Sequence, residues 1–344
     1  MIDTRKLGRT NIAVSMLGLG GAPLGNLYAP LADDEAHAVL DAGWDAGIRY
    51  FDTAPLYGFG LSERRFGERL KREKRDDFVL STKAGRLLRP TTEFGEGLNR
   101  QSYYSPMPFD TVYDYSYDGV MRSFADSLAR LQLKRIDILL LHDIGRLTHG
   151  NAHENHFRLA MTGGYRALDE LRRNGDVGAI GLGVNECEVC EEALEHGDFD
   201  VFLLAGRYTL LEQGALDILL PKCAARGASL IIGGPYNSGI LAQGTKAGGT
   251  LYYDYAPAPE NIIERVRRIE EICAAHKVAL AAAALQFPLK HPQVSCVLPG
   301  ARSAEEVRRN AALFQTAIPD ALWRDLKTSG CLRADAPIEN VRAA

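Results

Sequence analysis

Short hydrophobic runs alternate with longer amphipathic segments along most of this 344-residue chain. The runs have the length and the β-branched or leucine-rich composition of buried strands, and they number eight: Met16–Ala22, Tyr50–Ala54, Phe78–Lys83, Ile136–His142, Ala179–Asn185, Val201–Arg207, Ser229–Pro235 and Val294–Gly300. Helical periodicity follows each run and predicts helices over Asp33–Ala46, Leu61–Lys71, Gly119–Leu131, Gly164–Arg173, Asn185–Glu195, Gln213–Ala225, Asn261–His276 and Ser303–Leu313. Because closure of a parallel sheet removes both of its edges, this α/β order favours a (β/α)8 TIM barrel over an open sheet.

The chain offers no obvious place to divide it. No Pro/Gly/Ser linker or change of charge interrupts the alternation, so we expect a single barrel domain over residues 1–344. The two longest gaps predict long loops after strands three and seven, Ala84–Asp118 and Tyr236–Tyr255, on the carboxyl side of the barrel. Both are rich in tyrosine, which is equally consistent with covering a site at the barrel mouth and with packing the loops onto the rim.

Composition narrows the class of partner. Hydrophobic residues make up 46% of the chain, charged residues 24%, and the net charge is -4, so no overall positive field recruits nucleic acid or an anionic membrane. The six cysteines are scattered, and the amino-terminal segment lacks the apolar core of a signal peptide. We therefore expect a cytoplasmic protein that acts on a small molecule; the sequence leaves its oligomeric state open.

Four ionisable residues stand where the predicted strands end, which is where barrel enzymes carry their chemistry. Asp52 lies in strand two, Tyr57 in the loop after it, Lys83 ends strand three and His142 ends strand four. Each alone is as easily a structural residue, because a loop tyrosine usually packs and an aspartate often caps a turn. A lysine at the end of a buried strand needs a partner, however, and Asp52 is the obvious carboxylate for Lys83.

Together these four side chains predict proton transfer beside a hydride carrier. A phenol is a weak acid at neutral pH unless a cation favours its ionised form, and Lys83 would supply that cation to Tyr57. Asp52 would hold Lys83 in place, while His142 would bind the substrate oxygen. Since no side chain can donate or accept a hydride, the chemistry requires a bound cofactor.

Motifs along nearly the whole chain resemble those of the aldo-keto reductases. They are Lys6-Leu7-Gly8-Arg9-Thr10, which is similar to an opening β-hairpin, Phe51-Asp52-Thr53-Ala54-Pro55-Leu56-Tyr57-Gly58 with Ser62-Glu63, Thr82-Lys83, Asp137-Ile138-Leu139-Leu140-Leu141-His142, and Leu298-Pro299-Gly300-Ala301-Arg302. The resemblance implies a catalytic tetrad of Asp52, Tyr57, Lys83 and His142, with Tyr57 as general acid and base.

Further segments resemble the branch of this family that oxidises sugars and pyridoxal. They are Tyr113–Ser123, His142-Asp143 and Gly234–Gly239. The implied reaction converts a cyclic hemiacetal to a lactone, at C1 of L-fucose or another D-threo-aldose, or alternatively at the aldehyde-derived carbon of pyridoxal, where the product is 4-pyridoxolactone. The sequence leaves both substrates open.

The resemblance also implies a nicotinamide cofactor. Its contacts would come from Gly21, Asp52, Asn185, Asn237, Ser238, Gly239, Leu241, Gly300, Ala301, Arg302, Glu306 and Asn310. Two positions depart from the family, since Ala205 replaces a frequent carboxamide-binding Gln and Gly233 replaces a frequent stacking Tyr. Where members that use NADP have basic groups, this chain has Gly300 and the acidic Glu306, so NAD is expected over NADP, although Arg302 and Arg309 lie nearby.

Other patterns point elsewhere. Gly18-Leu19-Gly20-Gly21 lacks the spacing of a dinucleotide-binding fingerprint in an open sheet. Cys187 and Cys190, or the histidines at 149, 153 and 156, have spacings that occur in metal sites, but an exposed helix and a polar loop explain them more simply. A non-catalytic barrel that binds a nucleotide and a metal-dependent barrel hydrolase remain as alternatives, and the complete tetrad argues against the former.

Overall fold

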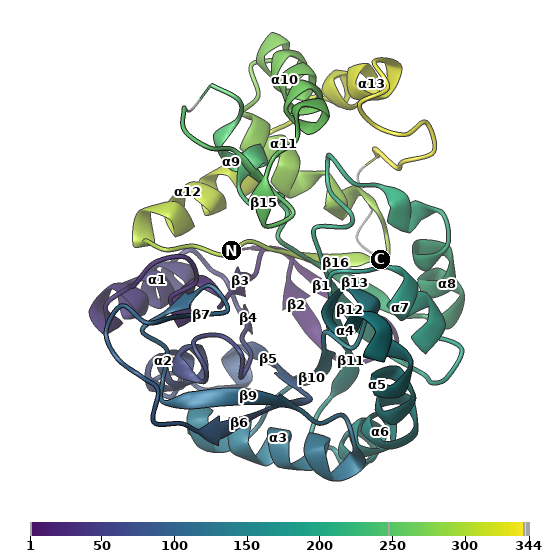
Figure 1. Cartoon of the computed structure of the whole chain (residues 1–344). Coiled ribbons are helices and arrows are strands. Elements are labelled where there is room, and N and C mark those ends of the chain that lie inside the picture. Colours follow the sequence, from purple (N-terminus) through teal and green to yellow (C-terminus); the bar gives the residue numbers. More distant parts are fainter. Residues whose placement is uncertain (1, 247, 340, 342–344) are drawn as a thin grey trace.

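The central sheet is a closed parallel barrel. The computed structural model describes residues 2–246, 248–339 and 341. Eight strands lie in the order β16-β13-β12-β11-β10-β5-β4-β3, and their bounds are β3 Leu19–Gly20, β4 Tyr50–Asp52, β5 Val79–Ala84, β10 Ile138–His142, β11 Ala179–Val184, β12 Val201–Ala205, β13 Ser229–Gly233 and β16 Val294–Leu298. The last strand joins the first, because Gly18 N donates to Val297 O (2.9 Å) and Val297 N donates to Met16 O (2.9 Å). The predicted barrel is therefore confirmed (Figure 1).

Helices surround this barrel, as the ribbon in Figure 1 shows. They are α1 Asp33–Asp45, α2 Leu61–Leu70, α3 Tyr117–Leu131, α4 Arg146–His149, α5 His153–Leu159, α6 Tyr165–Asn174, α7 Glu188–Ala193, α8 Leu219–Arg226, α9 Ile240–Gln243, α10 Glu260–Ala275, α11 Leu280–Gln286, α12 Ala304–Phe314 and α13 Asp320–Thr328. The pattern missed α11, whose residues from Leu280 to Leu285 are all buried. The predicted helix over 261–276 corresponds to α10, which packs on α11 and α13 at the outside of the molecule.

A β-hairpin precedes the barrel, as the opening motif predicted. Its strands β1 (Thr4–Lys6) and β2 (Ala13–Ser15) are antiparallel. Leu7 and Val14 of this hairpin pack with Tyr50, Ile138 and other side chains of the barrel interior. The hairpin therefore adds to the apolar filling of one end of the barrel and leaves the opposite end for polar groups.

Both long segments after strands three and seven contain secondary structure of their own. The first holds β6 (Arg86–Pro90) paired with β9 (Phe109–Tyr113), and β7 (Asn99–Arg100) paired with β8 (Tyr103–Tyr104). The second holds α9 and the pair β14 (Tyr252–Tyr253) with β15 (Ala256–Pro257). The sequence predicted both as loops, because the strands are short and their residues do not alternate between the faces of a core.

The main apolar core lies between the barrel strands and the helices, and a second cluster fills the barrel. Among the described residues no single helix is long and apolar enough to cross a membrane; only α10 with the segment 280–290 reaches that length, and the two are bent by 100°.

Candidate active site

Three of the four predicted catalytic residues form one connected group. Lys83 Nζ donates to Asp52 Oδ2 (2.7 Å), to the Thr53 carbonyl oxygen (3.0 Å) and to the hydroxyl oxygen of Tyr57 (3.0 Å). Lys83 and Asp52 are buried, with 1% and 2% of their surfaces exposed. The ammonium group is thus fixed by a carboxylate and a carbonyl, and its third hydrogen bond reaches the phenol.

Neighbouring strands bring these residues together. Strands β4 and β5 are parallel neighbours in which Asp52 pairs with Ser81, and Lys83 lies two residues further along the same face. Tyr57 lies in the turn between β4 and α2, and the backbone of Gly25 packs against it so closely that a Cβ at Gly25 would lie 2.4 Å from the carbonyl carbon of Tyr57. Glycine at position 25 therefore permits this placement of the phenol.

His142 completes the group at the end of β10. Its ring meets the ring of Tyr57 edge-on, with 5.9 Å between centroids. Its Nε2 lies 3.4 Å from Oδ2 of Asp143, which is also bound by Arg86 Nη2 at 2.5 Å, and its Nδ1 has no hydrogen-bond partner among the described residues. Burial, and next Arg86 and Lys83, lower the pKa of His142 well below its ordinary value, so the ring is neutral at physiological pH.

The phenol of Tyr57 holds its proton at neutral pH in the chain alone. Burial raises the pKa of Tyr57 well above 10, Asp52 and Asp143 raise it further, and Arg86 opposes them. The ammonium of Lys83 at 3.0 Å favours the ionised phenol. Burial also raises the pKa of Asp52, while Lys83 and the hydroxyl of Ser81 lower it. The group therefore provides an acid whose conjugate base has a cation beside it.

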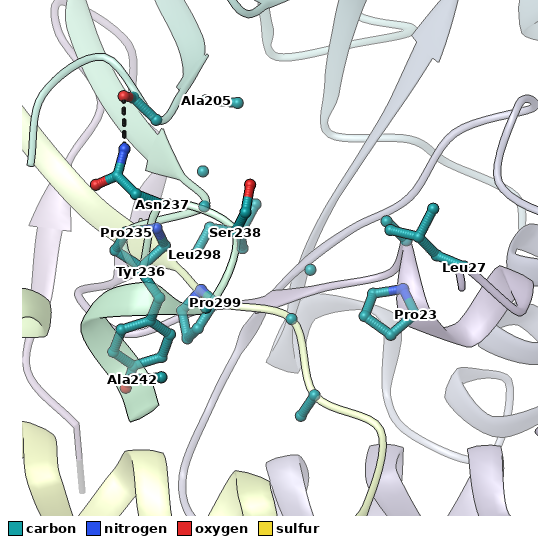
Figure 2. Close-up of a pocket in the computed structure, with 18 of the residues that line it drawn as sticks. Pro23, Leu27, Ala205, Pro235, Tyr236, Asn237, Ser238, Ala242, Leu298 and Pro299 are labelled. Atoms are coloured by element: carbon teal, nitrogen blue, oxygen red, sulfur yellow. Dashed lines mark hydrogen bonds between the residues drawn. The ribbon is translucent and has the colours of Figure 1, made fainter. Parts of the chain in front are cut away.

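A cavity of about 690 Å³ opens next to Tyr57 and Asp52 and extends to the amino end of α12. Figure 2 shows Asn237, Ser238 and Pro299 along one side of it, with Pro23 and Leu27 across from them. Its size lies within the range of cofactor pockets, about 300–1,000 Å³. Asn237 is itself held, because its Nδ2 donates to the Gly206 carbonyl oxygen (3.1 Å) and its Oδ1 accepts from Thr209 Oγ1 (2.6 Å).

Two glycines, Gly206 and Gly234, line this cavity. A Cβ at Gly234 would meet only Gly206 N, at 3.8 Å, and one at Gly206 would meet only Asn237 Nδ2, at 3.6 Å. Side chains there would project into free space, and their absence leaves room for a flat ring beside Ala205. The residues present therefore fit a nicotinamide dinucleotide.

Most of the residues predicted to contact the cofactor line this cavity: Gly21, Asp52, Asn237, Ser238, Gly239, Gly300, Ala301, Arg302, Glu306 and Asn310. Two do not. Asn185 lines a separate cavity with Glu186 and Arg207, and the side chain of Leu241 is buried in the main core. Conversely, sequence reasoning did not select Pro23, Leu27 and Tyr28, which line the cavity, whereas Tyr255 lines it from the tyrosine-rich segment 236–255 that could cover a site at the barrel mouth.

Arg302 and Glu306 at the amino end of α12 are engaged within the protein. Arg302 donates through Nη1 to the Leu27 carbonyl oxygen (2.7 Å) and through Nη2 to those of Ala29 (3.2 Å) and Pro30 (3.1 Å). Glu306 Oε2 accepts from Arg302 N (2.7 Å), while Glu306 N donates to Ser303 Oγ (3.1 Å). Side chains therefore already satisfy the Glu306 amide in the first turn of this helix and the Arg302 amide just before it.

The residues with metal-site spacing lie elsewhere. His149 and His156 stack on each other with 4.0 Å between centroids, next to Tyr113 and Tyr115. His153, predicted in a polar loop, is instead buried at the start of α5. Within the described part of the chain no group of three or more His, Cys, Asp or Glu side chains is arranged to hold a metal ion, and the six cysteines are free thiols.

The barrel, the group of Asp52, Tyr57 and Lys83, and the cavity next to it together define an oxidoreductase that uses a nicotinamide cofactor. Comparisons with known proteins agree. The sequence profile of the Aldo/keto reductase family matches residues 16–329, so the chain belongs to that family. It is 48% identical to the pyridoxal 4-dehydrogenase of Microbacterium luteolum, over 96% of this chain and 98% of that protein.

Two further relatives extend the comparison. The D-threo-aldose 1-dehydrogenase of a Pseudomonas species is 43% identical, over 92% of this chain and 94% of that protein. The structure of aldo-keto reductase AKR11C1 from Bacillus halodurans (holo form) superposes with a TM-score of 0.72 at 23% identity, covering 99% of both chains. This last similarity supports the fold alone.

Proposed function

We propose that this chain is an NAD-preferring dehydrogenase that oxidises a cyclic hemiacetal to a lactone, with Tyr57 as the general base. The observation that carries the proposal is the continuous contact from the phenol of Tyr57 through Lys83 to Asp52, at the wall of a cavity of dinucleotide size. Such a group moves a proton at one fixed point, which is what the oxidation of a hydroxyl requires from the protein.

The reaction removes one proton and one hydride from the substrate. Ionised Tyr57 accepts the proton of the hemiacetal hydroxyl, and the C–H electron pair leaves as hydride while the ring C–O–H becomes the C=O of the lactone. The nicotinamide, when bound, supplies the hydride acceptor. Lys83 stabilises the phenolate before transfer, and neutral His142, whose ring meets that of Tyr57 edge-on, is the residue proposed to hold the substrate oxygen.

The contacts of Arg302 and Glu306 support a preference for NAD. Recognition of the extra phosphate of NADP needs free cations or free amides. At this helix Arg302 is bound to three backbone carbonyl groups, and Glu306 places a carboxylate beside the first amides. A phosphate here would meet that negative charge, and the remaining candidate cation is Arg309.

Two substrates are compatible with the proposal, L-fucose or another D-threo-aldose at C1, and pyridoxal at its aldehyde-derived carbon. Each presents a cyclic hemiacetal carbon bearing one hydrogen and one hydroxyl group. The relatives named above include a dehydrogenase for each class, with 48% and 43% identity, so both belong in the same assay.

The test is the appearance of reduced cofactor when purified protein is mixed with NAD or NADP and a panel of aldoses and pyridoxal. The proposal expects turnover of at least one hemiacetal, faster with NAD than with NADP at equal concentrations. Cofactor binding without turnover of any substrate would instead favour a non-catalytic nucleotide-binding barrel. Activity lost on adding a chelator would favour a metal-dependent reaction.

A further inference from the structure

A chain of buried hydroxyl groups continues from the catalytic carboxylate into the barrel. Ser81 Oγ donates to Asp52 Oδ1 (2.7 Å), the oxygen that Lys83 does not use. The hydroxyl of Tyr50 lies 2.8 Å from Ser81 Oγ. All of these side chains are at most 2% exposed. Asp52 is therefore held from two sides, by an ammonium group on one oxygen and by a hydroxyl group on the other.

The direction of these hydrogen bonds is fixed by chemistry. The ionised Asp52 has no proton to give, so Ser81 donates to it, and because a hydroxyl has a single proton, Tyr50 must donate to Ser81. The order of donors is thus Tyr50 to Ser81 to Asp52, and each bond polarises the next because all three side chains are buried.

Packing alone does not explain the phenol of Tyr50. Its ring lies in an apolar cluster with Leu7, Ile138 and Leu298, where a phenylalanine would fill nearly the same volume. Burying a hydroxyl is costly unless it is hydrogen-bonded, and among the described residues Ser81 is the partner of this one. The hydroxyl therefore acts through Ser81 on Asp52.

We infer that Ser81 and Tyr50 are positioning residues, which hold Asp52 oriented and ionised and through it fix the charge and place of Lys83 beside Tyr57. They do not touch the cavity and act on the reaction only through Asp52. The expected effect on catalysis rests on the proposed function. The effect of Ser81 and Tyr50 on Asp52 does not, because it can be measured on the protein alone.

The electrostatics of Asp52 agree with this role. Burial raises the pKa of Asp52, whereas Lys83 and the hydrogen bond from Ser81 lower it. Removal of the Ser81 hydroxyl leaves the burial effect in place and takes away one opposing contact. The carboxyl would then keep its proton to higher pH, and a protonated Asp52 no longer pairs with the ammonium group of Lys83.

The first measurement needs neither cofactor nor substrate. Isotope-labelled aspartate carboxyl groups are titrated by NMR in wild type, Ser81→Ala and Tyr50→Phe, with the Asp52 signal assigned by its loss in Asp52→Asn. We expect the Asp52 midpoint to rise by about one pH unit in Ser81→Ala, a tenfold change in proton affinity, and by less in Tyr50→Phe. An unchanged midpoint in both variants overturns the inference.

Matched controls remove a buried hydroxyl elsewhere. Ser295→Ala removes a hydroxyl of β16 that donates to the carbonyl oxygen of Lys6. Tyr208→Phe removes a buried phenol that has no partner among the described residues. Both should leave the Asp52 midpoint where it is in wild type. A similar rise in the controls would mean that loss of any buried hydroxyl disturbs the barrel, and would also overturn the inference.

The second measurement is the pH profile of hemiacetal oxidation. In Ser81→Ala the rate should fall by up to about tenfold below the Asp52 midpoint, by less near neutral pH, and approach the wild-type rate as the pH rises, because alkali restores the carboxylate. A loss of the same size at every pH would indicate structural damage and contradict the role. If wild type oxidises no hemiacetal, the proposed function fails, while the titration still decides the inference on Asp52.

Discussion

Replacement of Lys83 by methionine tests the electrostatic basis of the reaction. Methionine keeps the length of the side chain without its charge, so it removes the ammonium from between Asp52 and Tyr57. Both partners are close, at 2.7 Å for Asp52 Oδ2 and 3.0 Å for the Tyr57 hydroxyl oxygen. The phenolate form of Tyr57 should therefore lose its nearest cation.

The size of the effect follows from the second distance. Two unit charges at the 3.0 Å separation of Lys83 Nζ and the Tyr57 oxygen interact with about 5 kcal/mol at an effective dielectric constant of about 20. That energy corresponds to about four pKa units for the phenol, so we expect oxidation at neutral pH to slow by about 10³–10⁴-fold. Without its partner, buried Asp52 should keep its proton to higher pH than in wild type. Because a protonated carboxyl group carries no charge, the loss of folding stability should be smaller than the roughly 3–5 kcal/mol that an unpaired buried charge costs.

The assay is steady-state oxidation of the best hemiacetal substrate with NAD, together with cofactor affinity and thermal unfolding. A matched control is Lys222→Met, which breaks a surface ion pair with Glu195 and should change none of these quantities appreciably. A Lys83→Met protein that is folded, binds NAD and keeps its turnover within tenfold of wild type would refute the electrostatic role.

Three further outcomes are expected. Because the pKa of Tyr57 lies well above 10, the phenolate fraction grows with pH, so oxidation should accelerate steadily between about pH 7 and pH 9; a flat profile would contradict a phenolate base. Glu306→Arg should raise the rate with NADP relative to NAD by at least about tenfold, because a cation replaces a carboxylate near the phosphate, and an unchanged ratio would reject that explanation of cofactor choice. Burial and His156 lower the pKa of His149 from 6.5 to about 4, so the folded protein favours the neutral ring more than the unfolded chain does. The resulting stabilisation is complete above pH 6.5 and is lost as the pH falls towards 4. His149→Gln should therefore reduce the fall in melting temperature over that range, and the same fall as in wild type would show that His149 does not carry it.

The barrel was predictable because its strands are buried on both faces and read as continuous hydrophobic runs. The ionisable residues at their carboxyl ends, such as Lys83 and His142, stand out against those runs. The register that pairs Asp52 with Ser81 then brings Asp52 and Lys83, which are 31 positions apart, within hydrogen-bond distance of each other.

Other features were hidden for physical reasons. Helix α11 has no polar face, because neighbours cover it on every side, and so lacks the periodicity that identifies a surface helix. The contacts of Arg302 with the loop at 27–30 join distant parts of the chain, since Arg302 and Ala29 are 273 positions apart. No local sequence pattern predicts such contacts. Asn185, predicted as the last residue of its strand, directly follows β11 and lines a separate cavity, which depends on loop packing that the sequence does not encode locally.

The central claim is that the hydroxyl of Tyr57 moves the proton, and Tyr57→Phe isolates that hydroxyl. The phenyl ring keeps its place beside Tyr103 and His142, so the cavity should be unchanged. Turnover and NAD affinity measured on the same preparation should show a loss of about 10²–10⁴-fold in turnover with nearly unaltered affinity. Turnover close to that of wild type would contradict the account.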